Sequence, residues 1–230
     1  MPVTRPGGPR CTGRSLDSRV RPGALSWREA VFGSRRWKDE GMTEFQASER
    51  HAQLLAYAQS LSPPSGWKVE VSGDEIIVMA GPSVIHQRNL LVVREQFDAH
   101  RPADLMPSEN TDLASPNVGK LRNPDLAYIP IAVVEPGGND VPAELAAIAV
   151  EIVSPSNPEN DLVGKVRDYP LMDIPLYLLI DPRDGVITLY SDPASGAYHQ
   201  QWNAGFGDTV PVPEPFAFDL ATDNLVRYPV

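Results

Sequence analysis

The stretch that most constrains this chain runs from Ala146 to Tyr169 and joins an apolar segment, a polar turn and a helix-like segment. Its first part, up to Val153, is an unbroken apolar run of strand length that contains one carboxylate, Glu151. A run without alternation is typical of a strand covered on both faces. An ionised carboxylate is costly to bury unless a cation or several donors meet it. We therefore expect the functional site at the end of this strand, where a bound metal ion or the ammonium of Lys165 can pair with the carboxylate of Glu151.

Length and composition favour one sizeable core. The chain has 230 residues, and the length alone does not require two domains. No apolar run approaches the roughly 20 residues of a membrane-spanning helix, so we expect a soluble protein without a membrane partner. Cys11 is the only cysteine, which excludes an intramolecular disulfide and a cysteine-based zinc cage. The default compartment is a reducing cytoplasm.

The net charge argues against one class of function. The formal charge is −10, and Lys and Arg outnumber Asp and Glu before Met42, so the remainder of the chain is more acidic than the whole. Broad, salt-sensitive binding of nucleic acid needs clustered Lys and Arg to neutralise phosphates. A site bridged by a divalent cation stays open, because a bound ion changes the local field.

The first 41 residues differ from the rest. They are rich in Arg, Pro, Gly and Ser and have no sustained helical or strand periodicity, which predicts disorder. Their Arg-rich composition also resembles an organelle transit peptide. In a third interpretation they are an extension assigned in error, and translation starts at Met42. In every case the predicted domain covers residues 42–230.

Two helices and a hairpin are predicted in the first half of that domain. A helix over 43–61 has Thr43 and Gln46 spaced as a capping box. Residues 67–71 and 75–80 read as a hairpin around Ser72, Gly73 and Asp74. A second helix runs from the Gly81–Ser83 region to about His100. The apolar positions expected to face inward are Phe45, Leu54, Leu55, Ala58 and Leu61 in the first helix, and Val84, Leu91 and Phe97 in the second.

Strands dominate the second half. A strand over 124–129 and a loop over 135–142 precede the strand that carries Glu151. A helix from about Pro158 to Tyr169 should end or kink at Pro170. Residues 175–180 and 186–190 are strands joined by the turn at 181–185. Strands and helices mix without strict alternation, so we expect an α/β domain with a mixed β-sheet between helices.

Three residues form the candidate site. Asp125 lies at the start of one predicted strand and Glu151 near the end of another, so both carboxylates can face one point if the two strands are neighbours. Hard oxygen ligands of this kind suit Mg²⁺ or Mn²⁺. Lys165 would enter from the next helix. Taken singly, each residue also has an ordinary structural interpretation: Asn-Pro-Asp is a turn signal, and Asp161 and Lys165 have the spacing of a solvated helix-face pair.

The order of four motifs resembles the Uma2 family, which is placed in the PD-(D/E)xK restriction-endonuclease-like superfamily. The motifs are N-P-D, then E-I-V-S-P-S, then D-x-x-x-K-x-x-x-Y, then I-P-L-Y-L-L-I-D-P, and they cover roughly residues 42–190. The resemblance implies a restriction-endonuclease-like mixed β-sheet flanked by α-helices, with Asp125 and Glu151 as metal ligands.

The chain departs from the pattern of the wider superfamily. The superfamily's lysine stands two residues after the second acid, where this chain has Val153. The family resemblance moves the lysine's role to Lys165. The tyrosine is followed by Pro170, and Asp173 stands where a glycine is expected before the next strand.

Three more residues are candidates for support. His86 matches a histidine that similar sequences carry near the start of that helix, and its alternative is a partly buried side chain that packs or caps the first turn. Tyr169 either lines the site through its hydroxyl or packs with a wet edge. Asp161 is the acid of the D-x-x-x-K motif.

The implied activity is hydrolysis of nucleic acid, with DNA as the expected substrate. Asp125, Glu151 and the backbone carbonyl of Ile152 would hold Mg²⁺ or Mn²⁺, and Lys165 would orient water or stabilise the transition state. A homodimer stays open. Two alternatives remain: a catalytically silent nuclease-like scaffold that binds proteins, which the acidic surface favours, and a metal-dependent hydrolase of smaller phosphoesters.

Overall fold

The computed structural model describes residues 49–64, 67–73, 75–79, 81–134 and 140–229. The expectations for residues 1–41, the capping box of Thr43 and Gln46, and the inward position of Phe45 lie outside these residues. Within the described part of the chain, no helix combines the length and the apolar character needed to cross a membrane.

The elements follow one another with short connections. The helical segments are α2 (Glu49–Ser60), α3 (Val84–His100), the 3₁₀ turns η1 (Pro116–Val118), η2 (Ile131–Val134) and η3 (Ala143–Leu145), the π-helix η4 (Asn160–Lys165) and α4 (Val166–Leu171). The strands are β1 (Lys68–Ser72), β2 (Glu75–Met79), β3 (Leu105–Ser108), β4 (Asp112–Ser115), β5 (Lys120–Arg122), β6 (Leu126–Pro130), β7 (Asp140–Pro142), β8 (Ile148–Ile152), β9 (Tyr177–Asp181), β10 (Val186–Ala194), β11 (Ala197–Gly205), β12 (Thr209–Val212) and β13 (Phe218–Ala221).

These strands form three sheets. The central sheet has the order β11-β10-β9-β8-β6-β3, and only β8 and β9 run parallel among its described pairs. A second sheet has the order β2-β1-β5-β4-β7, and β12 pairs with β13 alone. The predicted class, a mixed α/β fold with sheets flanked by helices, is confirmed. The predicted single sheet is replaced by several, because β1, β2, β4 and β5 pair with one another instead of extending the central sheet.

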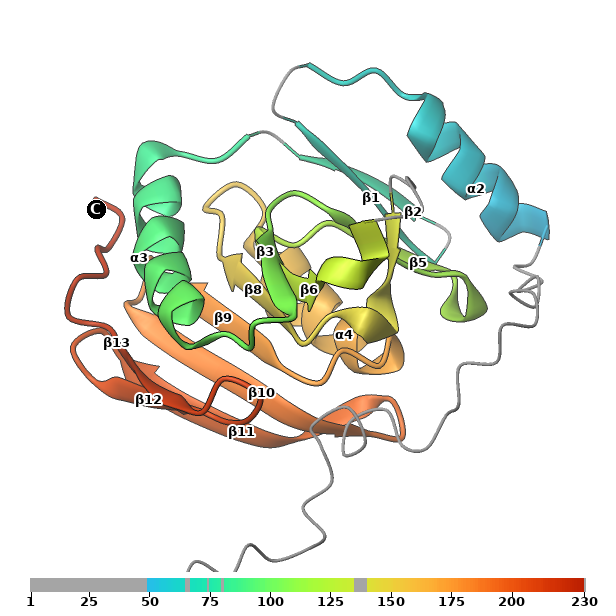
Figure 1. Ribbon diagram of the computed structural model, residues 1–230. Coiled ribbons are helices and arrows are strands. Elements are labelled where there is room, and N and C mark those ends of the chain that lie inside the picture. The colour runs from blue at the N-terminus through green and yellow to red at the C-terminus, as the bar shows by residue number, and fades with distance from the viewer. Residues whose placement is uncertain (1–48, 65–66, 74, 80, 135–139, 230) are drawn as a thin grey trace, which may run out of the picture. The chain divides into compact units, whose positions relative to one another are not determined.

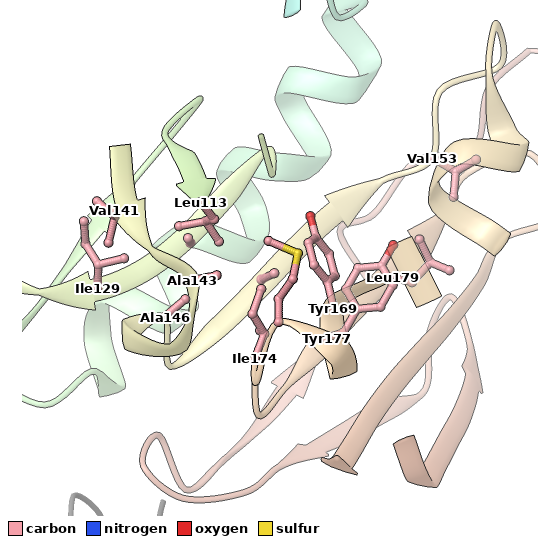
Figure 2. Packing of buried hydrophobic residues seen from close by; sticks show 13 residues of the cluster. Leu113, Ile129, Val141, Ala143, Ala146, Val153, Tyr169, Ile174, Tyr177 and Leu179 are labelled. Carbon is pink, nitrogen blue, oxygen red and sulfur yellow. The ribbon is translucent and has the colours of Figure 1, made fainter. Parts of the chain in front are cut away.

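Helices cover both faces of the central sheet. Side chains alternate between faces along a strand, so consecutive residues of β6 lie on opposite faces of the sheet. Tyr128 stacks on Phe97 of α3, with ring centroids 5.6 Å apart. Ala127 belongs instead to the buried cluster that contains Tyr169 of α4 and Tyr177 of β9. Figure 2 shows these two tyrosines side by side within that cluster. Glu151 has the same parity as Ala149 of this cluster, so it faces the side of the sheet that α4 covers.

The strand β1 separates two different interiors. Its sequence, K-V-E-V-S, alternates polar and apolar residues. Val69 and Val71 pack in a small apolar cluster with Ala58 of α2, which lies along the β1–β2 hairpin in Figure 1. Glu70 is buried on the opposite face, where it meets Arg122 of β5 and Lys165. One face of this hairpin therefore closes an apolar core and the other lines a charged interior.

Several local predictions can be compared with the structure. The hairpin is confirmed, with Ser72 paired to Glu75 and Gly73 at φ +59° in the turn. The second helix is confirmed, but two of its predicted inward residues are wrong: Val84 is 86% exposed and Leu91 is 54% exposed. The apolar face of α3 is shifted around the helix, and its buried residues are His86, Asn89, Leu90, Val93 and Phe97. The predicted loop over 135–142 ends in a strand, because β7 pairs in parallel with β4.

Candidate functional site

A small pocket lies where the start of β6, the end of β8, the start of β1 and the π-helix meet. Its volume is about 40 Å³, which is room for only a few water molecules. Its charged or titratable lining residues are Lys68, His86, Asp125, Glu151, Asp161 and Lys165. A larger hollow of about 220 Å³ lies over β10, β11 and β12, but the residues that line it are uncharged. Of these two hollows, the smaller one is therefore the one that brings titratable side chains together.

Glu151 is almost completely buried, with 1% of its surface exposed. Its Oε1 accepts a hydrogen bond of 2.6 Å from the hydroxyl of Tyr169 and lies 2.8 Å from the ammonium of Lys165. Burial raises the pKa of Glu151 to about 8, in spite of Lys165, and the charges of Asp125 and Asp161 add to the increase. The surroundings of this carboxyl are thus short of positive charge.

Lys165 lies among three carboxylates. Its Nζ is 2.8 Å from Glu151 Oε1, 3.0 Å from Asp161 Oδ1 and 3.4 Å from Glu70 Oε1. Burial would lower the pKa of this lysine, but the three acids outweigh burial and raise it well above its usual value. The interpretation of Asp161 and Lys165 as a solvated pair is wrong, because both side chains are buried.

The helix that carries Lys165 is locally widened. It is helical from Pro158 and takes π geometry from Asn160 to Lys165 before α4 begins. Such a bulge leaves backbone groups outside the α-helical pattern and is frequent at functional sites. The hydroxyl of Tyr177 donates a hydrogen bond of 3.0 Å to the carbonyl of Asp161 in this segment. The central sheet thereby supports the turn from which Lys165 projects.

Asp125 connects two strands at the pocket. The backbone N–H of Ile152 donates to its Oδ2 over 2.9 Å, which joins the start of β6 to the end of β8. His86 Nε2 lies 2.8 Å from the same oxygen, and Lys68 Nζ lies 2.7 Å from Oδ1. Burial opposes ionisation, but Lys68 and His86 outweigh it and hold the pKa of Asp125 well below its ordinary value. Asp125 is thus an ionised carboxylate between two cationic or donor groups.

The observed geometry of His86 agrees in part with each of its two interpretations. Its backbone N–H donates to Ser83 Oγ over 3.2 Å, which caps α3, while its ring reaches Asp125 at the pocket. Nδ1 of the same ring is buried and has no hydrogen-bond partner among the described residues. Tyr169 has no wet edge, because it is fully buried and its hydroxyl contacts Glu151.

The lysine position of the wider superfamily is apolar here. Val153 is fully buried in the cluster that contains Tyr169 and Leu179, as Figure 2 shows. Lys165 brings an ammonium to Glu151 from the π-helix instead. The structure thus brings Asp125, Glu151 and Lys165 to one pocket, together with His86 and Asp161.

Sequence reasoning missed a buried ionic network behind the pocket. Arg122 of β5 donates to Glu70 Oε2 over 2.8 Å and to Asp168 of α4, and Lys120 Nζ lies 3.0 Å from Asp168 Oδ1. Ser72 Oγ also donates to Asp168, over 2.7 Å. The polar positions of the alternating segments K-V-E-V-S and K-L-R share one face of the sheet. Such alternation usually marks a solvent-exposed face, so it did not indicate that these charges are buried.

Asp125 and Glu151 are the residues of this pocket that could hold a hard divalent cation. Among the described residues no three Asp, Glu, His or Cys side chains are already grouped as metal ligands. Mg²⁺ usually binds through one or two carboxylates and keeps several waters, so a third side chain is not required. Asp125 and Glu151 line the same pocket, and both polar contacts of Glu151 fall on Oε1, which leaves Oε2 outside them.

Comparisons with known proteins agree with this fold. The family model of Uma2, described as a putative restriction endonuclease, matches residues 52–224. Among solved structures, the chain is similar to the crystal structure of a putative nuclease belonging to DUF820 from Anabaena variabilis ATCC 29413. The sequence identity is 18%, the TM-score is 0.60, and the match covers 76% of this chain and 96% of the other. At this identity the likeness concerns the fold alone. No curated protein matches the chain.

Proposed function

This chain belongs to the Uma2 family, and from that premise we propose that it is a metal-dependent endonuclease that hydrolyses phosphodiester bonds of nucleic acid, with DNA as the substrate to test first. The observation that carries the proposal is the meeting of Asp125, Glu151 and Lys165 at one pocket from three separate segments of the chain. Burial of a lone ionised carboxylate costs free energy. Two carboxylates beside a lysine are the groups that metal-assisted hydrolysis requires.

Each of these residues has a task in the proposed reaction. Asp125 and Glu151, with the backbone carbonyl of Ile152, would hold Mg²⁺ or Mn²⁺. When bound, such an ion lowers the pKa of a water ligand and neutralises charge on a phosphate. Lys165 would place its ammonium beside the attacked phosphate and stabilise the negative charge that grows there. Its ion pairs with Asp161 and Glu70 would fix the ammonium in position before substrate arrives.

Tyr169 and His86 would support the two carboxylates. The hydroxyl of Tyr169 fixes Glu151 Oε1 at 2.6 Å, which orients the other oxygen. His86 fixes Asp125 Oδ2 at 2.8 Å, together with the N–H of Ile152. Groups that orient a ligand in this way commonly change metal affinity when they are removed.

A cleavage assay tests the proposal. Single- and double-stranded DNA and RNA are incubated with the protein in Mg²⁺, in Mn²⁺ and in EDTA, beside Glu151→Gln and Lys165→Met. Loss of one preorganised charged group typically lowers the rate about 10²-fold to 10³-fold, so both variants should be nearly inactive. The matched control is Asp181→Asn at the end of the neighbouring strand β9, whose carboxylate pairs with Arg183 at 2.7 Å and does not line the pocket. It should cut at the wild-type rate, and equal cleavage by folded Glu151→Gln would refute the proposal.

The acidic composition favours a second candidate, a silent nuclease-like scaffold that binds basic proteins. With a formal charge of −10, the chain is poorly suited to hold a polyanion over a wide surface. Calorimetric titration with Mg²⁺ or Mn²⁺ separates the two. An enzyme should bind the ion and lose that binding in Glu151→Gln, whereas a scaffold should show neither effect. A model phosphodiester such as bis(p-nitrophenyl) phosphate, cut in preference to polynucleotides, would instead indicate a hydrolase of smaller phosphoesters.

A further inference from the structure

Lys68 is a cation of the pocket to which the proposed reaction assigns no task. It is the first residue of β1, and its side chain is 13% exposed, compared with 2% for Lys165. Its Nζ lies 2.7 Å from Asp125 Oδ1 and 3.5 Å from the carbonyl oxygen of Asn123. Lys68 is thus the more accessible of the two lysines that line the pocket.

The position of this ammonium matters because of what else surrounds Asp125. The other oxygen, Oδ2, already meets the N–H of Ile152 and the ring of His86. Lys68 therefore occupies the oxygen that is left. A second cation that binds Asp125 must share Oδ1 with this ammonium or push it away, because two positive charges at hydrogen-bond distance from one oxygen repel each other strongly.

The two lysines differ in how firmly they are held. Lys165 has three carboxylate partners, Glu151, Asp161 and Glu70. Among the described residues, the polar contacts of Lys68 are to one carboxylate and one carbonyl. A lysine with a long flexible stem and one acidic partner can turn without leaving several buried charges behind.

We propose, on the basis of the function proposed above, that Lys68 is a second phosphate-binding residue of this site. Its ammonium neutralises Asp125 while no divalent cation is bound, and it turns to a non-bridging oxygen of the substrate phosphate when Asp125 takes a cation. Lys68 thus exchanges one anionic partner for another, and the pocket never holds an unpaired buried carboxylate.

Titration of the variant Lys68→Gln with Mg²⁺ alone tests whether Lys68 competes with a divalent cation for Asp125. Because a competing positive charge at Asp125 is removed, the Mg²⁺ dissociation constant should fall about tenfold. Cleavage of DNA at saturating Mg²⁺ should fall about 10²-fold, since one charge on the phosphate is lost. Lys68→Arg keeps the charge and should restore wild-type Mg²⁺ affinity. Loss of a merely structural ion pair would not raise the Mg²⁺ affinity while it lowers the cleavage rate.

Lys120→Gln is the matched control. Lys120 lies on the adjacent strand β5, its side chain is 10% exposed, and it pairs with Asp168 at 3.0 Å outside the pocket lining. This variant also removes a nearly buried lysine–aspartate pair, so it should lower stability, but its Mg²⁺ dissociation constant should equal that of wild type.

Chemical labelling of wild-type protein provides a second test that needs no variant to fold. An amine-acetylating reagent is applied with and without Mg²⁺, and each lysine is quantified by mass spectrometry. Lys68 should become several times more reactive in Mg²⁺, whereas Lys120 should not change. Equal labelling of Lys68 in both conditions would overturn the inference.

The outcomes distinguish this inference from the proposed function. If wild type binds Mg²⁺ and cuts DNA but Lys68→Gln binds Mg²⁺ no more tightly, the role of Lys68 is wrong and the nuclease assignment stands. If wild type neither binds Mg²⁺ nor cuts nucleic acid, the proposed function fails and the inference fails with it.

Discussion

At the scale of single residues, the site depends on one lysine shared by several acids. Lys165 is buried with Glu151, Asp161 and Glu70 around its ammonium. Removal of one partner of a buried ionic group leaves charge without compensation, which is strongly destabilising. The residue therefore has a structural task beside the proposed chemical one, and an activity measurement on its variants needs a stability measurement beside it.

Lys165→Met should lower the free energy of unfolding by about 3–5 kcal/mol at neutral pH. The loss should shrink in acid, because protonation of the carboxyls relieves their repulsion. Urea unfolding at pH 5 and pH 8 measures both effects. Lys120→Met is the comparison, and it should have a smaller effect because Asp168 keeps Arg122 as a partner. A larger loss at pH 5 than at pH 8 would contradict this account.

Asp168 should contribute to the acid sensitivity of the fold. Burial opposes its ionisation, but Arg167, Ser72, Arg122 and Lys120 outweigh burial and hold its pKa well below the ordinary value. A depressed folded pKa stabilises the protein above the unfolded pKa of about 3.9. That stabilisation is lost as the pH falls toward the folded pKa. Asp168→Asn should be less stable at pH 7 and lose less stability between pH 5 and pH 2, as urea unfolding across this range would show.

Sequence reasoning found the acids and the lysine of the pocket but missed their partners on β1, Lys68 and Glu70. Glu151 could be found because a charge inside an apolar run has few explanations. Lys68 and Glu70 could not be found in this way, since alternation in a short hairpin strand usually means one wet face. Only the packing of η4 and α4 on that face shows that it is buried.

At the scale of elements, local pattern predicted where helices and strands lie better than it predicted their faces. Ser83 and the preceding proline gave the start of α3 correctly. Its inward face was partly wrong because Val84 and Leu91 are exposed, while the polar residues His86 and Asn89 are buried. Asn89 is satisfied by the backbone of Val226 far along the chain, and such a long-range pairing leaves no periodic signal.

The connection from α4 to β9 contains a residue in a strained conformation. Asp173 has φ +58°, in the left-handed region that costs most residues about 1–2 kcal/mol. This geometry explains why a glycine was expected there from the family resemblance. Asp173→Gly should raise the free energy of unfolding by about 0.5–1 kcal/mol, partly offset by the freer unfolded chain. A fall in the urea midpoint of this variant would show that the aspartate side chain makes a compensating contact.

At the scale of the whole molecule, we expect the acidic chain to neutralise only a few phosphates of a bound nucleic acid. The cations that line the proposed site are Lys68 and Lys165, with His86 beside them. Because the slope of log affinity against log salt is about −0.9 for each phosphate neutralised on duplex DNA, we expect a slope of about −2 or shallower. Binding of duplex DNA by the inactive Glu151→Gln protein, measured by fluorescence anisotropy between low and moderate salt, tests this. A much steeper slope would indicate a basic surface elsewhere in the chain.

Divalent cation should also stabilise the whole fold. A ligand that binds only the folded chain adds about 2.7 kcal/mol at a free concentration of 100 times its dissociation constant. We therefore expect Mg²⁺ to raise the thermal midpoint of wild type and to leave that of Glu151→Gln unchanged, with EDTA reversing the rise. An equal rise in both proteins would place the ion outside this pocket.

The alternation along β1 has a consequence for how the chain must assemble. A slip of a single residue in the pairing of β1 would exchange its two faces. Val69 and Val71 would then face the charged interior, and Lys68 and Glu70 would face the apolar cluster beneath α2. The turn at Gly73 fixes the alignment of Ser72 with Glu75. A misaligned hairpin would therefore disrupt both the pocket and the apolar cluster beneath α2. The pocket can form only when the β1–β2 hairpin pairs in the correct register.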